Sequence, residues 1–332
     1  MVAGEPVLRW GLLGTARINR VIIPALRASA RNRLDAVASR TPHRAGAYAR
    51  EWGITKALGS YEALLADSSI DVVYIPLPNA LHAEWTVRAV EAGKHVLCEK
   101  PLALSVAEVD RIRAAAACHH RIVTEAFMYR HHPQSDLVVR LVKDGAIGEV
   151  RLIRGSFRFM HTRPGDARWL PEMGGGSLWD IGCYPVSFSR MVMGKEPVVV
   201  GGEQVLGPTG VDIAFAGVMR FPGDVLAQLD SSFTTPFHTG MELVGSAGTL
   251  IVRNPFKPGL GAVVDLVDER GEARTLPAAD QELYSGEVED LAAAALDGTP
   301  PRISLADSRG NAAVLVALLE AARTGQTVPL RI

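Results

Sequence analysis

The sequence has few of the features that mark secreted, membrane-bound or nucleic-acid-binding proteins. Its 332 residues include three cysteines, an odd number without metal-ligand spacing, which favours a reducing cytoplasm. The formal net charge of −1 gives no polybasic surface for nucleic acid or an anionic membrane. No apolar run approaches the ~20 residues that span a bilayer, and Met1 to Pro6 lacks the character of a signal peptide. We therefore expect a cytoplasmic protein.

Apolar residues make up 48% of the chain, enough for two domains with sizeable cores. The first part alternates between β-rich runs and helical periodicity. Strands are expected at 8–14, 34–39, 71–76, 95–98 and 122–123, and helices at 15–29, 42–52, 60–65, 80–92 and 105–118. This alternation predicts right-handed βαβ crossovers and a doubly wound, mostly parallel sheet. We assign residues 1–125 to an α/β Rossmann domain that binds a nucleotide.

Strand signals dominate the second part, which we assign to an α+β domain over residues 126–332. Successive strands with short turns predict one large, open, mostly antiparallel sheet. The strands are expected at 150–159, 198–204, 212–220, 225–233, 239–245, 249–252 and 263–267, with helices at 135–144, 182–193, 285–296 and 305–324. The outer face of such a sheet must be covered. We therefore expect the domain to form a homodimer or homotetramer.

The first strand runs into an imperfect dinucleotide fingerprint. Gly14 occupies the first glycine position of GxGxxG, whereas Ala16 and Asn19 stand at the second and third. The context of strand, tight turn and helix still lets backbone amides hold a pyrophosphate, and Ala16 permits close approach. We predict that the loop binds a dinucleotide through Gly14, Thr15, Ala16, Arg17 and Ile18; the alternative is an ordinary βα turn.

The end of the second strand indicates which dinucleotide is bound. An NAD site places an acid there to bond the ribose hydroxyls, but Asp35 lies near the start of the strand. The strand ends instead in Ser39 and Arg40, with Arg44 just beyond. A hydroxyl followed by a guanidinium suits a 2′-phosphate, so we favour NADP(H) over NAD(H). The alternative is a charged, solvated loop.

A short apolar run, His95 to Cys98, ends at Glu99, Lys100 and Pro101. Proline cannot extend a central strand, so Glu99 and Lys100 are expected at its carboxyl end, the edge where open α/β sheets bind ligands. By itself Lys100 is either a reactive ammonium or an exposed charge at a strand end.

Several motifs, taken in order, resemble the glucose–fructose oxidoreductase / inositol dehydrogenase / MocA family over nearly the whole chain. The nearest branch holds sugar 3-ketoreductases and xylose or dihydrodiol dehydrogenases. Besides the glycine loop, the motifs lie at 38–40, 76–82, 93–101, 145–150 and 174–184. The resemblance implies a Rossmann domain followed by an open-sheet domain, with substrate bound between them. It also implies that the nicotinamide end of the cofactor meets Leu77, Asn79, His82, Glu99 and Lys100.

In much of this family a Lys-Asp-His set moves the proton, and Tyr184 stands at the histidine position. A free tyrosine, with a pKa of about 10, is a poor base at neutral pH, but a nearby ammonium favours its phenolate. We predict Tyr184 as the acid/base, Lys100 as its electrostatic partner, and Asp180 as a ligand of substrate hydroxyls or an orienting group. Arg168 and Trp169 are predicted to reach cofactor phosphate or cover the nicotinamide; structural packing is an equal alternative.

These patterns predict an NADP(H)-dependent oxidoreductase that acts on a sugar, sugar nucleotide or polyol, without a metal. One alternative is a xylose- or dihydrodiol-type dehydrogenase that works oxidatively. The other is a non-catalytic regulatory protein that senses a dinucleotide; the presence of both Lys100 and Tyr184 weighs against it.

Overall fold

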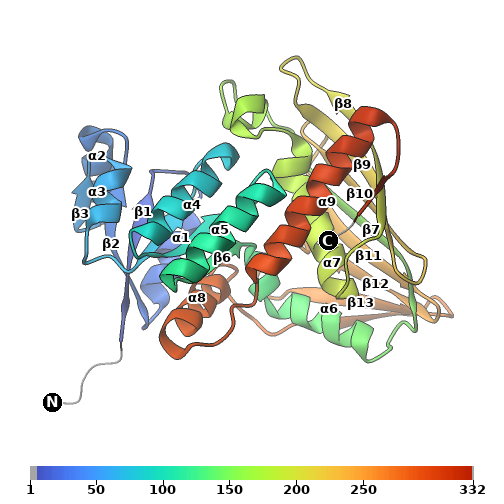
Figure 1. Cartoon of the computed structure of the whole chain (residues 1–332). Coiled ribbons are helices and arrows are strands. Elements are labelled where there is room, and N and C mark those ends of the chain that lie inside the picture. Colours follow the sequence, from blue (N-terminus) through green and yellow to red (C-terminus); the bar gives the residue numbers. More distant parts are fainter. Residues whose placement is uncertain (1–5, 331–332) are drawn as a thin grey trace. The chain divides into compact units, whose positions relative to one another are not determined.

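The computed structural model describes residues 6–330, so most of the segment from Met1 to Pro6 lies outside the described part. The chain forms two compact units. One contains the chain up to Met128 together with Tyr284–Ser308, and the other contains Tyr129–Leu283 together with the chain from Arg309 onward. Figure 1 labels the elements of both units.

The first unit is built on a six-stranded parallel sheet in the order β3-β2-β1-β4-β5-β6. Its strands are β1 (Leu8–Leu13), β2 (Asn32–Ala38), β3 (Lys56–Leu58), β4 (Val72–Ile75), β5 (His95–Glu99) and β6 (Val123–Ala126). Its helices include α1 (Asn19–Ala28), α2 (Pro42–Trp52), α3 (Tyr61–Ala66), α4 (His82–Glu91), α5 (Val106–His119) and α8 (Ser285–Asp297). The strand order reverses between β1 and β4, and ligands of doubly wound sheets bind at such a switch point.

Helices cover both faces of this sheet because its strands are apolar on both sides. On one face Trp10 packs in a core with Ile22 of α1 and Leu291 of α8. On the other face Gly11 lies against α3, where a Cβ atom would stand 2.6 Å from Leu64 Cδ1. The core thus fixes the direction of β1 and the position of the loop that follows it.

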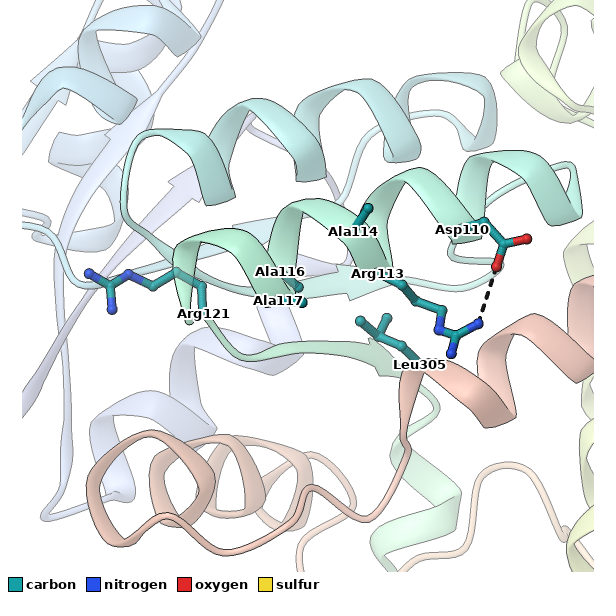
Figure 2. Close-up of a pocket in the computed structure, with 7 residues that line it drawn as sticks. All are labelled: Asp110, Arg113, Ala114, Ala116, Ala117, Arg121 and Leu305. Carbon is teal, nitrogen blue, oxygen red and sulfur yellow. Dashed lines mark hydrogen bonds and ion pairs between the residues drawn. The ribbon is translucent and has the colours of Figure 1, made fainter.

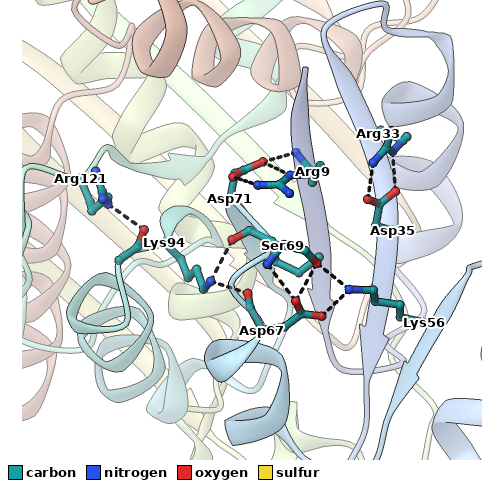
Figure 3. A network of polar contacts seen from close by, with 11 residues as sticks. Arg9, Arg33, Asp35, Lys56, Asp67, Ser69, Asp71, Lys94 and Arg121 are labelled. Atoms are coloured by element: carbon teal, nitrogen blue, oxygen red, sulfur yellow. Dashed lines mark hydrogen bonds and ion pairs between the residues drawn. The ribbon is translucent and has the colours of Figure 1, made fainter. Parts of the chain in front are cut away.

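The amino edge of the sheet is held by a polar network (Figure 3). Lys94 is 4% exposed, and its ammonium donates to the carbonyl oxygens of Asp67 at 2.7 Å and Ile70 at 2.8 Å. Arg9 Nε and Nη2 each donate to an oxygen of Asp71 at 2.7 Å. These charged side chains connect the amino ends of β1, β4 and β5. They lie at the edge of the sheet opposite to the carboxyl edge, where ligands of such sheets bind.

The second unit is built on a nine-stranded sheet in the order β14-β13-β12-β11-β7-β10-β9-β8-β15. Neighbouring strands are antiparallel except β7 and β10, which are parallel. The strands are β7 (Val150–Arg158), β8 (Val199–Leu206), β9 (Asp212–Phe221), β10 (Val225–Ser232), β11 (His238–Gly245), β12 (Gly248–Arg253), β13 (Val263–Asp268), β14 (Ala273–Pro277) and β15 (Val328–Pro329).

Three helices pack in this unit: α6 (Pro133–Lys143), α7 (Cys183–Met193) and most of α9 (Leu305–Thr324). Helix α7 contacts β7 and β10, and α6 contacts β13. Gly202 and Gly217 are partners on β8 and β9, and a Cβ atom on Gly217 would lie 3.0 Å from Leu318 Cδ2 of α9. The paired glycines therefore let the helix lie close to the sheet.

The predicted fold class, a parallel Rossmann sheet with a second, large and mostly antiparallel sheet, is confirmed. Residues 284–308, assigned from the sequence to the second domain, pack within the first compact unit. The reason is that α8 buries Val288 and Leu291 in the core beside β1. The functional division at residue 125 stays a prediction. Within residues 6–330, no helix combines the length and apolar character needed to cross a membrane.

Candidate functional site

The glycine loop has the geometry expected of a dinucleotide site. Gly14 adopts a φ of 124°, a conformation that favours glycine. Asn19, at the third glycine position, is buried and donates from Nδ2 to the Gly14 carbonyl oxygen at 2.9 Å. Helix α1 begins at Asn19 without a side-chain cap. Its first amides, those of Asn19, Arg20 and Val21, donate to the carbonyl oxygens of Ala16, Arg17 and Ile18. The strand, the tight turn and the helix thus have the arrangement of a dinucleotide site, in which a pyrophosphate would face the loop of residues 14–18.

The predicted loop ligands surround this turn. Thr15, Ala16 and Ile18 are half-buried, and Arg17 is exposed. A Cβ atom on Gly14 would lie 3.4 Å from Leu77 Cδ2, so the loop at the end of β4 lies beside the turn. The structure therefore brings Leu77 and the glycine loop together, as expected for two segments at one switch point.

The end of β2 carries positive charge and no acid. Ser39 is buried directly after the strand, and Arg40 is exposed. Asp35 lies inside β2, where it pairs with Arg33 at 2.7 Å. This arrangement keeps the carboxylate of Asp35 away from the place of an NAD-type acid.

Tyr61 is a residue of this region that the sequence reasoning missed. A Cβ atom on Gly14 would lie 3.6 Å from the Tyr61 phenol oxygen. Burial raises the pKa of Tyr61, while the charges of Arg40 and Arg44 lower it. The positive charges of Arg40 and Arg44 thus act on a hydroxyl beside the glycine loop, a setting that suits an anionic ligand. Only the cap signal at Ser60 pointed to this helix.

His82 connects two loops that were predicted to contact the cofactor. Its ring is fully buried, with Nδ1 2.7 Å from the Pro101 carbonyl oxygen and Nε2 2.7 Å from the Leu77 carbonyl oxygen. Burial lowers the pKa of His82, so the neutral ring donates to one of the two carbonyls. The structure gives His82 a positioning role, and its contact with the cofactor stays a prediction. Asn79 begins the short 3₁₀ helix Asn79–Leu81 before it.

Strand β5 ends at Glu99, so Glu99 and Lys100 lie at the carboxyl end of a central strand. The fully buried Tyr74 of β4 donates from its phenol to Glu99 Oε1 at 2.5 Å. The Lys100–Pro101 peptide bond is cis. Tyr74 thus orients the carboxylate that immediately precedes the predicted catalytic lysine.

A second carboxyl group, Glu287 of α8, is buried near this pair. It is 1% exposed, and neither of its oxygens has a hydrogen-bond partner among the described residues. Burial and the negative charge of Glu99 raise the pKa of Glu287 well above its ordinary value. Burial and Glu99 also raise the pKa of Tyr74, which therefore stays a donor. No local pattern pointed to Glu287, because nothing near it in the chain shows on which sheet α8 packs.

In the second unit, Asp180 lies in a π-helical turn, Leu178–Gly182, that leads directly into α7. π-Helical turns are rare in proteins, and those that occur are often found at functional sites. Arg168 Nε donates to Asp180 Oδ2 at 2.6 Å, and Arg168 Nη1 lies 3.2 Å from Asp166 Oδ1. The charge of Asp180 raises the pKa of Arg168. Arg168 therefore orients Asp180 here, and its predicted role as a cofactor ligand stays a prediction.

Trp169 belongs to a small stacked group in the same unit. Its indole nitrogen donates to the Arg163 carbonyl oxygen at 2.9 Å, and its ring stacks on His161 with centroids 4.8 Å apart. This packing accounts for Trp169 without a cofactor, so its contact with the nicotinamide also stays a prediction.

Tyr184 stands in the first turn of α7, one turn after Asp180, and is 5% exposed. Aromatic rings surround its own: Phe157 at 5.3 Å, Phe256 at 5.4 Å and Tyr129 at 5.9 Å between centroids. Apolar packing of this kind holds the ring in one orientation. Lys100 belongs to the first unit and Tyr184 to the second, and each is described within its own unit.

A separate cavity of about 510 Å³ in the first unit contains none of the predicted site residues (Figure 2). The two arginine side chains that line it already have partners. Arg113 pairs with Asp110 at 3.2 Å, and Arg121 donates to the Gly93 carbonyl oxygen at 2.7 Å. Among residues 6–330, no group of three or more His, Cys, Asp or Glu side chains could hold a metal ion.

Known proteins resemble the chain over nearly its whole length. Residues 8–127 match the family model described as an oxidoreductase family with an NAD-binding Rossmann fold, and residues 136–251 match the GFO/IDH/MocA C-terminal domain. The D-xylose 1-dehydrogenase (NADP(+)) 2 of Haloferax volcanii is 38% identical over 328 residues, covering 97% of this chain and 100% of that protein.

Two solved structures also superpose closely. A 3-ketoreductase from Actinomadura kijaniata, in complex with NADP and TDP-benzene, gives a TM-score of 0.90 at 32% identity and covers 95% of this chain and 98% of that one. An aldose–aldose oxidoreductase from Caulobacter crescentus, complexed with glycerol, gives 0.90 at 29% identity and covers 98% and 100%.

Proposed function

Because the chain belongs to the GFO/IDH/MocA family of oxidoreductases, we propose that it transfers a hydride between NADP(H) and a carbonyl–alcohol pair of a sugar, sugar nucleotide or polyol. The observation that carries the proposal is the cofactor end of the first unit. There helix α1 follows Gly14 without a side-chain cap, and the charges of Arg40 and Arg44 act on Tyr61. Strand β2 does not end in an acidic residue. Support also comes from the NADP in the ketoreductase complex and from the NADP(+) of the xylose dehydrogenase.

The cofactor supplies or accepts the hydride when it is bound, and the chain must then handle one proton at the substrate oxygen. We propose Tyr184 as the acid/base, since packing among aromatic rings fixes its orientation. Lys100 would polarise the same oxygen and favour the phenolate as its electrostatic partner. Asp180, oriented by Arg168 at 2.6 Å, would bind a neighbouring substrate hydroxyl.

The direct test follows nicotinamide absorbance with a panel of ketosugars, aldoses and diols, using NADPH or NADP⁺ and, separately, NADH or NAD⁺. Turnover of at least one sugar with a preference for the phosphorylated cofactor supports the proposal. A clear preference for NADH would refute the assignment of Ser39 and Arg40. Absence of redox change with every member of the panel would favour the dinucleotide-sensing alternative.

Oxidation of a xylose- or dihydrodiol-type substrate is the second candidate. It is favoured by the 38% identity with the xylose dehydrogenase over nearly all of both chains. The same panel separates the two directions: faster reduction of NADP⁺ by aldoses or diols than oxidation of NADPH by ketosugars would select the oxidative reading.

We further propose a cytoplasmic homodimer or homotetramer that associates through the outer face of the nine-stranded sheet. Leu226, Leu152 and Val244 are register partners across β10, β7 and β11, and Leu226 is 41% exposed. Val218 of β9 is exposed to the same extent. Such a row of apolar side chains is suited to association with a second copy. Sedimentation of the wild type as a stable monomer would contradict this proposal, whereas an oligomer that Leu226→Glu dissociates would support it.

A further inference from the structure

We propose that Asp212, at the start of β9, is a positioning residue that holds the glycine-rich segment and the π-helical turn, which carries Asp180 and leads into the helix of Tyr184. The inference rests on the proposed function, because it assigns Asp212 a role in the geometry of that acid/base. Every contact that carries it lies within the second unit.

Asp212 makes two hydrogen bonds to the start of the helical turn. It is 4% exposed, and its Oδ2 accepts from the Ser177 hydroxyl at 2.7 Å and from the Leu178 amide at 2.7 Å. The Ser177 hydroxyl oxygen lies 2.9 Å from that of Ser231 on β10. Two strands of the sheet thus hold one end of the turn.

The π-helical turn depends on this partner because it has no side-chain cap of its own at Ser177. The first amides of a helix need acceptors when they are buried. Asp212, which is remote in sequence, supplies one of them. The backbone two residues before Asp180 is therefore fixed to the sheet.

Glycine at two positions allows the turn to approach the sheet this closely. Gly176 has a φ of 115°, and a Cβ atom there would overlap the Asp212 carboxylate. A Cβ atom on Gly182 would lie 3.1 Å from the Ser231 hydroxyl. The glycine residues thus let the Asp212 carboxylate reach the π-helical turn, which bears Asp180 and leads into the helix of Tyr184.

The groups that face the Asp212 carboxyl are uncharged: the Ser177 hydroxyl and Leu178 amide from the turn, with the Ser231 hydroxyl behind them. Burial raises the pKa of Asp212 to about 6, and the hydrogen bonds from Ser177 and Leu178 oppose that shift. The group is therefore ionised at neutral pH and gains a proton in mild acid, when it becomes a weaker acceptor.

The test compares Asp212→Ala, which removes the acceptor, with Asp212→Asn, which keeps an acceptor oxygen but does not titrate. Small displacements of reacting groups cost up to about 100-fold in rate, so we expect Asp212→Ala to lower kcat by about 10- to 100-fold. NADPH affinity should stay unchanged, because the glycine loop lies in the other unit. Asp212→Asn, a neutral acceptor like the protonated carboxyl, should have an intermediate kcat at neutral pH, close to that of the wild type below pH 6.

Two further readouts separate positioning from a merely structural role. The wild-type kcat should fall as the pH drops through about 6, and Asp212→Asn should lack that fall. In hydrogen exchange, the amides of 176–184 should exchange faster in Asp212→Ala than in Asp212→Asn. The matched control is Asp230→Ala, which removes a half-exposed aspartate of the same sheet, 3.7 Å from Arg158, and should change neither quantity.

The proposal would be overturned if Asp212→Ala had the same kcat and the same hydrogen-exchange rates as the wild type. It would also be overturned if the kcat of Asp212→Asn still fell as the pH dropped through about 6. If Asp212→Ala does not fold, the pH profile of Asp212→Asn decides. A wild type that turns over no sugar would refute the proposed function, and hydrogen exchange of 176–184 would still decide whether Asp212 holds the turn.

Discussion

Replacement of Arg40 by alanine should weaken the binding of NADPH and leave that of NADH unchanged. A charge-assisted hydrogen bond to phosphate contributes about 1.5–3 kcal/mol. Arg40 is exposed, so solvent screens part of this contribution. Arg44 also acts on Tyr61 and stays in place. We therefore expect a loss of about 1–2 kcal/mol, which is roughly 5- to 30-fold in the Kd of NADPH.

The assay is a titration of nicotinamide fluorescence with each cofactor at two salt concentrations. The NADPH difference between wild type and Arg40→Ala should shrink at high salt, because salt screens an exposed charge pair. Arg33→Ala is the matched control, since Arg33 lies on the strand that precedes Arg40 but pairs with Asp35 at 2.7 Å. The assignment of Arg40 to the 2′-phosphate would be refuted if Arg40→Ala weakened the binding of NADPH and NADH equally. It would also be refuted if Arg33→Ala weakened NADPH binding as much as Arg40→Ala does.

Two predictions concern stability. Glu287→Gln should become more stable relative to the wild type as the pH rises above about 4.5. The reason is that a buried carboxyl with a raised pKa destabilises the folded wild type when the pH rises and favours its ionised form. Tm values of both proteins from pH 5 to 8 check this, and a constant difference would contradict it. Lys94→Met should lower the free energy of unfolding by about 1–3 kcal/mol, because the buried Ile70 carbonyl loses its Lys94 donor and the part-buried Asp67 carbonyl keeps only the Ile70 amide; urea unfolding measures the loss, and an unchanged midpoint would contradict it.

Much of the fold could be predicted because the local signals agree with the tertiary structure. The helices Pro42–Trp52 and Leu305–Thr324 lie where the periodicity places them. Helix α1 begins at Asn19, later than predicted, because Thr15 to Ile18 form the turn after β1 instead. The strands β3 and β14 were missed because they are short and lie at or beside sheet edges, where burial leaves little pattern.

The candidate site was predictable only where it is local in sequence. The ends of β2 and β5 place Arg40 and Lys100 at the edge where ligands bind, and strand-end signals were enough to find them. Tyr61, Glu287 and Asp212 were missed because each meets the site through a long-range contact. Periodicity shows which face of an element is buried, but not which element covers it.

The acid/base assignment is tested most directly by the turnover of Tyr184→Phe. With NADPH and the substrate that the wild type reduces fastest, we expect kcat to fall about 100-fold or more, the usual range for loss of a general acid. The Kd of NADPH should stay within about twofold, since the glycine loop and Arg40 lie in the other unit. The control is Tyr129→Phe, a neighbouring ring 5.9 Å away that donates to Ser187, which should keep most of its turnover. Near-normal kcat in Tyr184→Phe would contradict the account.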